Sequence, residues 1–195
     1  LAQPGVSEQV AATGVRYLRL LREGQYHLVV GNPPYQSKGK LSSKWLDGLS
    51  SAGRADTFAA FMLRAPGLTR QGGLFGFVTL SNWQFLGVFE GLRKELFVRN
   101  HLVSLADLGK GAFSSGSALI SSSIHLFRSD NSSSPPTVAV RLELDRPSAT
   151  VVSSALLGAG VRFEFNARQF SAIPGQPLVY WWTQEFLAQY KVQIS

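Results

Sequence analysis

The turn Asn32-Pro33-Pro34-Tyr35 combines groups that could bind and orient a planar substrate. Asn32 offers a side-chain carbonyl oxygen as an acceptor, and Tyr35 offers a flat amphipathic ring three residues on. The two prolines fix φ and remove two amide donors, so the carbonyls of Asn32 and Pro33 cannot join a ladder or a helix and are left pointing outward. Two acceptors beside one stacking face suit the exocyclic amino group of a planar base.

A short apolar strand is expected to position this turn. Val29 and Val30 favour a buried strand because branched side chains fit a pleated surface, and Gly31 lets the backbone approach another molecule closely. Apolar residues at helical spacing predict a helix over residues 7–23 that stops at Gly24. A helix followed by a short, nearly continuous apolar strand is typical of α/β folds, in which parallel strands are buried on both faces.

Helix and strand signals continue after residue 55. Asp56 is expected to cap a helix through about Thr69, which Pro66 either kinks or ends early. One face of this helix carries Phe58, Phe61, Met62 and Ala65. After two glycines, residues 74–80 predict a second buried strand, and Ser81-Asn82-Trp83 follow at its carboxyl end. In open α/β sheets, ligands bind at such ends.

The second half of the chain is expected to complete a mixed sheet. A helix over 84–98 is predicted to face the sheet with Phe85, Leu86, Phe89, Leu92, Leu96 and Phe97. Strands over 101–107 and 118–127, joined by a flexible turn over 109–117, form an antiparallel pair that closes the sheet. Residues 129–136 are a linker by composition, and alternating residues predict half-exposed strands over 138–144 and 161–165.

Composition limits the class of protein. A chain of 195 residues with 45% hydrophobic content can bury one sizeable core, so one domain or one and a fraction is expected. No apolar run reaches membrane-spanning length and there is no signal peptide, so we expect a cytoplasmic protein without a membrane partner. The chain begins with Leu rather than Met, which indicates a cut-out or truncated piece.

No metal site is expected. The absence of cysteine excludes disulfides and thiolate ligands, and His27, His101 and His125 have no ligand spacing between them. Each histidine flanks an apolar segment, where an ordinary position at a strand end is the expected role.

The formal charge of +7 favours a polyanionic partner, with nucleic acid as the obvious candidate. The plainer alternatives are a solubility surplus, or a fragment whose acidic half is missing. A long loop over residues 36–55 surrounds the anchor Trp45 with the cations Lys38, Lys40, Lys44 and Arg54. We expect these cations to contact DNA phosphates beside the target base; the alternative is a solvated surface loop.

Three stretches resemble the N6-adenine-specific DNA methyltransferases. Asn32-Pro33-Pro34-Tyr35 after a Val-rich strand resembles motif IV of the amino-methyltransferases, in the form most familiar from enzymes that methylate adenine N6. Residues 56–85 resemble the motif V to VI region of large adenine-specific methyltransferases. The Ile-Pro-Gly-x-Pro segment at 173–177, followed by Tyr-Trp at 180–181, is similar to one that follows the catalytic domain in methyltransferases of BREX phage-defence systems, which narrows the resemblance to the BREX and type IIG restriction-modification kind.

The resemblance implies transfer of a methyl group from S-adenosylmethionine to the N6 amino group of an adenine flipped out of double-stranded DNA. In that role, the Asn32 side-chain oxygen and the Pro33 carbonyl would accept hydrogen bonds from N6, Pro34 would set the geometry, and Tyr35 would stack on the base. Asn32 and Pro33 would also border part of the cofactor site. Phe113 could match a second aromatic that the family places against the base, with simple hairpin packing as an equal alternative.

The resemblance also implies an incomplete domain. The expected fold is the second half of a Rossmann-like class I methyltransferase sheet, divided into a partial catalytic domain over 1–128, a linker over 129–136 and a β-containing extension over 137–195 that leads toward a missing C-terminal region. The Gly-rich cofactor loop and the acidic residue that family members carry do not precede Asn32. The isolated piece is therefore predicted to be inactive, and its missing N-terminal part or other defence-system subunits are candidate partners.

Two other interpretations share these residues. Release-factor glutamine methyltransferases and some rRNA methyltransferases present the same tetrapeptide to a planar amide or amino group, but the long basic loop and the extension argue against their compact chains. The non-enzyme alternative is a truncated remnant that binds DNA, or a partner chain, without catalysis. The late aromatic residues either contact DNA or form a core against whatever follows; they are Trp181, Trp182, Phe186 and Tyr190.

Overall fold

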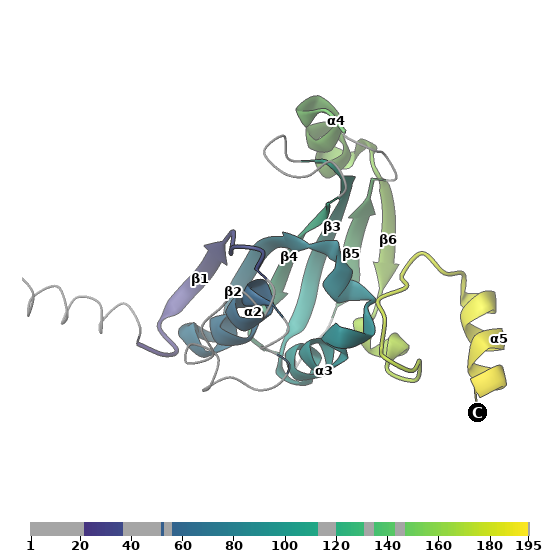
Figure 1. The fold of residues 1–195 in the computed structure, drawn as a ribbon, viewed down its shortest axis with the longest axis horizontal. Helices are drawn as coiled ribbons and strands as arrows, with labels where there is room; N and C mark the ends of the chain where they lie inside the picture. Colours follow the sequence, from purple (N-terminus) through teal and green to yellow (C-terminus); the bar gives the residue numbers. More distant parts are fainter. Residues whose placement is uncertain are drawn as a thin grey trace, which may run out of the picture.

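The computed structural model describes residues 22–36, 52, 56–112, 120–130, 135–142 and 147–194. Its strands form a six-stranded mixed sheet in the order β1-β2-β4-β3-β5-β6 (Figure 1). The strands are β1 (Tyr26–Gly31), β2 (Thr69–Leu80), β3 (His101–Lys110), β4 (Ser121–Arg128), β5 (Thr137–Arg141) and β6 (Val161–Phe165). The expected α/β class, with an antiparallel closing pair in β3 and β4, is confirmed.

The strand directions bring the carboxyl ends of four strands to the same end of the sheet. β1 pairs parallel with β2, and β3 pairs parallel with β5, whereas β4 and β6 run antiparallel to their neighbours. The carboxyl ends of β1, β2, β3 and β5 therefore lie at the same end of the sheet as the amino ends of β4 and β6. We call this the carboxyl end of the sheet. The turn at residues 32–35 leaves β1 there.

Helices pack beside this sheet around a common core. The longer ones are α2 (Thr57–Leu68), α3 (Glu90–Arg99) and α5 (Gln184–Ile194), and α2 contacts β2 and α3. Short helical segments are η4 (Ser81–Gln84), η5 (Gly87–Phe89), α4 (Ala149–Ser154), η6 (Ala155–Ala159) and η7 (Ala167–Phe170). The main core contains the fully buried side chains of Phe58, Met62, Phe75, Trp83, Leu92 and Phe127.

α2 matches its prediction except at one side chain. Asp56 caps the helix, accepting a hydrogen bond from the Phe58 N–H, and Pro66 lies inside the helix without ending it. Phe58, Met62 and Ala65 are buried as expected. Phe61 was expected on the same buried face and is instead 48% exposed. It lies at the edge of this helix face, where it lines a hollow beside residues 29–34 instead of packing into the core.

β2 and the segment after it begin differently from the prediction. β2 starts at Thr69 rather than at 74, because Gly72, with φ +73, allows an irregular pairing in which the Gly72 N–H donates to the Ser129 carbonyl at 3.1 Å. The helix predicted over 84–98 is also wrong at its start, since α3 begins at Glu90. Leu86 has extended backbone angles and breaks the helical run. Phe85 and Leu86 are consequently 46% and 43% exposed rather than turned toward the sheet.

β1 is less buried than a doubly covered parallel strand. Val30 is 66% exposed and Leu28 is 54% exposed, which corrects the expectation of a buried strand. Within the described part of the chain, β1 pairs with β2 alone, so its other edge and much of its side-chain surface are open.

Residues 137–165 continue the same sheet. β5 is hydrogen-bonded to β3, and β6 is hydrogen-bonded to β5. Ala139 and Val140 are both buried, so the alternation expected over 138–144 is replaced by a more covered strand. The division into a partial catalytic domain, a linker and an extension stays a prediction.

His125 does not lie at a strand end. It sits in the middle of β4, between Phe77 of β2 and Leu105 of β3, and is 1% exposed. Burial lowers its pKa to about 3, so the ring is neutral at physiological pH. Within the described residues, neither ring nitrogen has a hydrogen-bond partner. The expectation of a strand-end role is wrong here because the alternation of side chains along β4 places His125 on the same buried face as Ser123 and Phe127.

Candidate active site

The turn at residues 32–35 brings its two chemically useful side chains together. Asn32 is exposed, Pro33 is buried, and Tyr35 is half-buried with its ring packed against the main core. The Tyr35 hydroxyl donates a hydrogen bond to Oδ1 of Asn32 at 3.3 Å. An amide oxygen and an aromatic ring therefore meet at the carboxyl end of β1, as the sequence pattern requires.

Acceptor capacity remains available in this turn. Burial raises the pKa of Tyr35, so its hydroxyl stays protonated as a donor at neutral pH. One bond to Oδ1 leaves a second lone pair on that oxygen. Within the described residues, no hydrogen bond occupies the Pro33 carbonyl. Among the described residues, both oxygens therefore keep acceptor capacity for a further donor.

Asp56 fastens the end of the turn to the start of α2. The Gln36 N–H donates to Oδ1 of Asp56 at 3.2 Å, and the Phe58 N–H donates to the same oxygen at 3.3 Å. The Thr57 N–H and hydroxyl both donate to the Gln36 carbonyl, at 3.0 and 3.1 Å. Burial raises the pKa of Asp56, and backbone hydrogen bonds lower it in part. Asp56 is a cap, as expected, and also a positioning residue for the turn.

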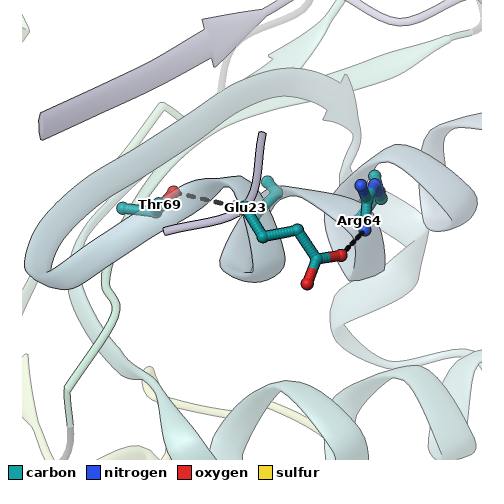
Figure 2. A network of polar contacts seen from close by, with 4 residues as sticks. Glu23, Arg64 and Thr69 are labelled. Carbon is teal, nitrogen blue, oxygen red and sulfur yellow. Dashed lines mark hydrogen bonds and ion pairs between the residues drawn. The ribbon is translucent and has the colours of Figure 1, made fainter. Parts of the chain in front are cut away.

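The chain before β1 is fastened to the other end of α2. The Gly24 N–H donates to the Gly67 carbonyl at 2.9 Å, and the Gln25 N–H donates to the Leu68 carbonyl at 3.1 Å. Figure 2 shows the Glu23 carboxylate directed at Arg64, with 2.6 Å between Oε1 and Nη1. Because both of these side chains are largely exposed, this ion pair contributes at most about 1 kcal/mol. The backbone bonds and the pair together hold β1 along α2.

Gly31 allows a close approach between β1 and β2 of this chain, rather than between β1 and another molecule. A Cβ at this position would lie 3.2 Å from the ring of Phe77 on β2. The sequence predicted approach to another molecule; the structure instead shows the backbone of β1 pressed against its neighbour. Because β1 lies so close to the Phe77 ring, the turn and this ring line the same hollow.

A largely apolar hollow of about 390 Å³ opens between the turn and α2. Its lining includes Asn32, Pro33, Pro34, Phe61, Arg64 and Phe77. Phe61 offers an exposed aromatic surface there, and sequence reasoning missed this role by assigning the ring to the core. The signal that could have found it is a second helical stripe, in which Phe61, Ala65 and Leu68 share spacing and all line the hollow.

A buried arginine organises the neighbouring turn after β2. Arg93 is 0% exposed and donates to the carbonyls of Trp83 at 2.6 Å, Leu86 at 2.9 Å and Gly175 at 3.1 Å. Burial lowers its pKa to about 10, against the opposing effect of Glu90, so it remains charged at neutral pH. The sequence held no signal for this role, because arginine on a helix is ordinarily a surface residue.

The Ile-Pro-Gly-x-Pro segment packs on this same turn. Ile173 and Leu178 are buried in the main core, and the Leu178 N–H donates to the Gln84 carbonyl at 2.8 Å. The Arg141 guanidinium carbon lies 4.1 Å from the centroid of the Trp181 ring. Trp182 packs edge-on against Phe186. Part of the late aromatic group is therefore core, and Phe186 remains 48% exposed.

The other predicted site residues lie outside the described part of the chain. These are the loop cations Lys38, Lys40, Lys44 and Arg54, and the aromatic Phe113. Their roles stay predictions. Among the described residues, no group of three or more His, Cys, Asp or Glu side chains could hold a metal ion. No helix within the described ranges is long and apolar enough to cross a membrane.

Comparisons with known proteins identify a family and two curated relatives. The family model described as Eco57I restriction-modification methylase matches residues 7–113. The adenine-specific methyltransferase PglX of Lacticaseibacillus casei (strain Zhang) is 27% identical over 166 residues, which cover 80% of this chain and 14% of PglX. The adenine-specific methyltransferase BrxX of Escherichia coli O9:H4 (strain HS) is 27% identical over 168 residues, covering 84% of this chain and 14% of BrxX.

A solved structure supports the fold. The type ISP restriction-modification enzyme LlaGI, as a nuclease-deletion mutant in complex with a DNA substrate mimic, aligns with a TM-score of 0.63 and 17% identity, covering 91% of this chain and 20% of that one. At this identity the likeness concerns the arrangement of strands and helices alone. The chain spans 14% of the length of the two curated relatives.

Proposed function

The chain belongs to the Eco57I restriction-modification methylase family, and from this premise we propose that it carries the base-binding half of a DNA adenine-N6 methyltransferase. The observation that carries the proposal is the turn at 32–35, where the Asn32 amide oxygen lies 3.3 Å from the Tyr35 hydroxyl, next to a Pro33 carbonyl that accepts no hydrogen bond from the described residues. The names of the two relatives, both adenine-specific methyltransferases, support adenine as the substrate.

The turn would activate the target nitrogen by accepting hydrogen bonds from it. The lone pair of adenine N6 is delocalised into the ring, which makes the amino group a poor nucleophile. Hydrogen bonds from N6 to Oδ1 of Asn32 and to the Pro33 carbonyl draw the nitrogen toward tetrahedral geometry and localise that lone pair. The Tyr35 ring stacks on the base and offsets part of the few kcal/mol lost when a base leaves the duplex. The remaining catalysis is alignment of the reacting atoms.

The hollow beside the turn suits part of the methyl donor. S-adenosylmethionine would supply an electrophilic methyl group when bound. The flat apolar walls formed by Phe61 and Pro34 fit a planar ring, and Asn32 and Pro33 border the same space. These residues would hold one portion of the donor. The Gly-rich loop that the family uses for the rest does not precede Asn32 in this chain.

Among the described strands β1 lies at the edge of the sheet, which supports a partner for this half-domain. Leu28 and Val30 are more than half exposed, and an unpaired apolar edge strand tends to acquire another strand. We infer that a cofactor-binding segment, or another defence-system subunit, pairs there and completes the site. The isolated chain is accordingly predicted to be inactive, and a cytoplasmic location likewise stays a prediction.

Binding of an extruded base tests this proposal. A duplex carrying 2-aminopurine opposite an abasic site is titrated with the 195-residue chain. We expect the wild-type chain to quench the 2-aminopurine fluorescence and Tyr35→Ala to lose this quenching. The control Phe186→Ala removes an exposed ring on α5 and should quench the fluorescence as wild type does. Equal quenching by both variants would contradict the assignment of Tyr35. Methyl transfer to adenine-containing DNA by the chain alone would contradict the predicted inactivity.

Two rival functions make different predictions. A glutamine or rRNA methyltransferase would bind a peptide amide or structured RNA at the same turn in preference to the DNA duplex. A non-catalytic remnant would bind DNA without dependence on Asn32, because no base would enter the turn. Competition by release-factor peptide, by RNA and by DNA therefore separates the three.

A further inference from the structure

The connection between β5 and β6 forms a small lobe made of α4 and η6. Arg141, at the end of β5, pairs in register with Val161, at the start of β6, so the lobe springs from the carboxyl end of the sheet. The turn at 32–35 leaves the sheet at this same end. Figure 1 shows α4 standing clear of the sheet above the ends of β3, β5 and β6.

A separate small core holds the lobe in place. Ala106, Val140 and Ala155 are buried together there with Leu108 and Leu142, and Val152 of α4 packs against them. Gly160 closes tightly on this core, since a Cβ at that position would lie 2.8 Å from Cγ1 of Val140 and 3.0 Å from the Ala155 carbonyl. The backbone of the lobe is therefore anchored rather than free.

The lobe exposes aliphatic side chains, Leu156 and Leu157 in η6 and Val151 and Val161 nearer its base. Leu157 is 88% exposed, and Leu156, Val151 and Val161 are 41%, 38% and 66% exposed. Gly158, with φ +133, turns the chain sharply immediately after Leu157 and leaves that side chain projecting. Single exposed leucines are ordinary on protein surfaces, but an anchored lobe that presents four aliphatic residues suggests contact with another molecule.

The lobe itself carries no charged side chain and is rich in hydroxyl groups, and at its base the cation Arg162 and the anion Glu164 both lie exposed on β6. Arg162 is exposed and is steadied by a 3.3 Å hydrogen bond from its Nη2 to the Leu156 carbonyl. Lys110, at the end of β3, is also exposed. Residues 147–163 contain no Asp or Glu, and their exposed hydroxyls are those of Ser148, Thr150, Ser153 and Ser154. Arginine, lysine and hydroxyl side chains around an apolar tip are complementary to a phosphate backbone with a groove between its strands.

We propose that this lobe is a second DNA contact, in which Leu157 inserts into the duplex that flanks the target adenine and Arg162 binds a nearby phosphate. The inference rests on the proposed function and adds to it a contact outside the base-binding turn. Proteins that bend DNA insert apolar side chains between base steps in this way, while nearby cations and hydroxyls hold the backbone. The lobe has no acidic residue of its own, and among the described residues at its base the exposed cations Arg162 and Lys110 outnumber the exposed Glu164, which favours a polyanion over an ordinary protein partner.

The spacing places this contact on the flank of the target. β1 and β5 are separated by four steps in the sheet, and strands lie about 4.8 Å apart, so the lobe lies about 19 Å across the sheet from the turn. At about 3.4 Å per base pair, this distance corresponds to roughly six base pairs of duplex. Leu157 is thus too distant to touch the extruded adenine, and it acts on flanking DNA.

Duplex length provides the test. Fluorescence anisotropy is measured for the 195-residue chain with hairpin-capped duplexes that carry either about 4 or about 12 base pairs on each side of an adenine opposite an abasic site, lengths chosen on either side of the estimated reach. The variants are Leu157→Ser and Arg162→Gln. Matched controls at the opposite end of the sheet are Val98→Ser, which alters a 68% exposed residue of α3, and Arg70→Gln, at the start of β2.

On the long duplex we expect both lobe variants to bind about fivefold more weakly than wild type, with Arg162→Gln also lowering the salt slope by about one, while both controls bind normally. On the short duplex, the lobe variants should match wild type. Equal affinity of Leu157→Ser and wild type for the long duplex overturns the lobe contact while leaving the base-binding proposal intact. Absence of any duplex binding by wild type also overturns it, and the 2-aminopurine titration then judges the turn separately.

Discussion

Two turns at the carboxyl end of the sheet, one after β1 and one after β2, use their backbone carbonyls in opposite ways. After β2, the buried Arg93 guanidinium binds the carbonyls of Trp83 and Leu86, so that turn is sealed into the core. After β1, Asp56 holds the turn through backbone N–H groups, and within the described residues the Pro33 carbonyl stays unoccupied. The Asp56 carboxylate accepts hydrogen bonds from backbone N–H groups, so it does not occupy the carbonyl oxygens of the turn. The proposed binding site for an amino group therefore falls at the first turn, whose carbonyl has no partner among the described residues, and not at the second.

Removal of Arg93 should break the sealed turn with the largest effect. In Arg93→Met, the carbonyls of Trp83, Leu86 and Gly175 lose their donor in a buried setting, and we expect the free energy of unfolding to fall by about 3 kcal/mol. Chemical denaturation measures the change. The neighbouring Lys94→Met, on an exposed side chain, is the control. A loss equal to that of the control would show that the guanidinium does not hold this turn.

Truncation of Asn32 should disable the open turn without unfolding it. In protein that carries this chain together with the cofactor-binding segments, Asn32→Ala removes one of two acceptors for N6, and methyl transfer should fall about 100-fold. Because Asn32 is exposed, the melting temperature should stay that of wild type. Scintillation counting of labelled methyl groups on DNA measures the first quantity, and calorimetry the second. Retained activity with Asn32→Ala would contradict the proposed use of the amide oxygen.

Acid should loosen the sealed turn through His125, whose ring lies 5.2 Å from that of Trp83. The folded state holds this histidine neutral with a pKa of about 3, whereas the unfolded value is 6.5. The unfolded chain therefore binds the proton more readily below pH 6.5, so stability is full above that pH and declines as the pH falls. Between pH 7 and pH 5 the loss should be about 2 kcal/mol.

His125→Leu isolates that contribution from those of other groups. Burial and the nearby Arg128 and Arg168 also lower the pKa of His101. Wild type and His125→Leu should therefore both keep the part of the pH dependence of stability that comes from His101. Denaturation of wild type and His125→Leu over the same pH range should show the shallower dependence in the variant. Identical dependence in the two proteins would mean that His125 is not neutral in the folded state.

Loss of the Asp56 carboxylate should have the smallest effect and should act on the open turn alone. Asp56→Ala removes the cap of α2 and the bond to the Gln36 N–H, for an expected cost of about 1 kcal/mol. The turn should also loosen, so 2-aminopurine quenching by Tyr35 should weaken. Ser148→Ala, which removes the cap of α4, is the matched control and should leave quenching unchanged. Equal quenching in both variants would contradict a positioning role for Asp56.

Features encoded by neighbouring residues were predictable here. Asp56 caps α2 because its side chain needs only the N–H group two residues ahead, and β1 ends where two prolines remove the donors that a ladder requires. Burial was predicted less well. Val30 and Phe61 both have apolar side chains with plausible core spacing, yet 66% and 48% of their surfaces are exposed. Whether an apolar residue is covered depends on which elements lie over it, and a local pattern does not contain that information.

By itself, the sequence determined the chemistry of the turn, since Asn32, two prolines and Tyr35 restrict their own backbone and supply their own acceptor and ring whatever surrounds them. Only the tertiary structure decided which turn keeps its acceptors open. Arg93 reaches the Gly175 carbonyl across 82 positions of sequence, and the Gln36 N–H reaches Asp56 across 20. Hydrogen-bond donors are allocated by distance in space, so the choice between a sealed turn and a binding turn is made when the chain packs.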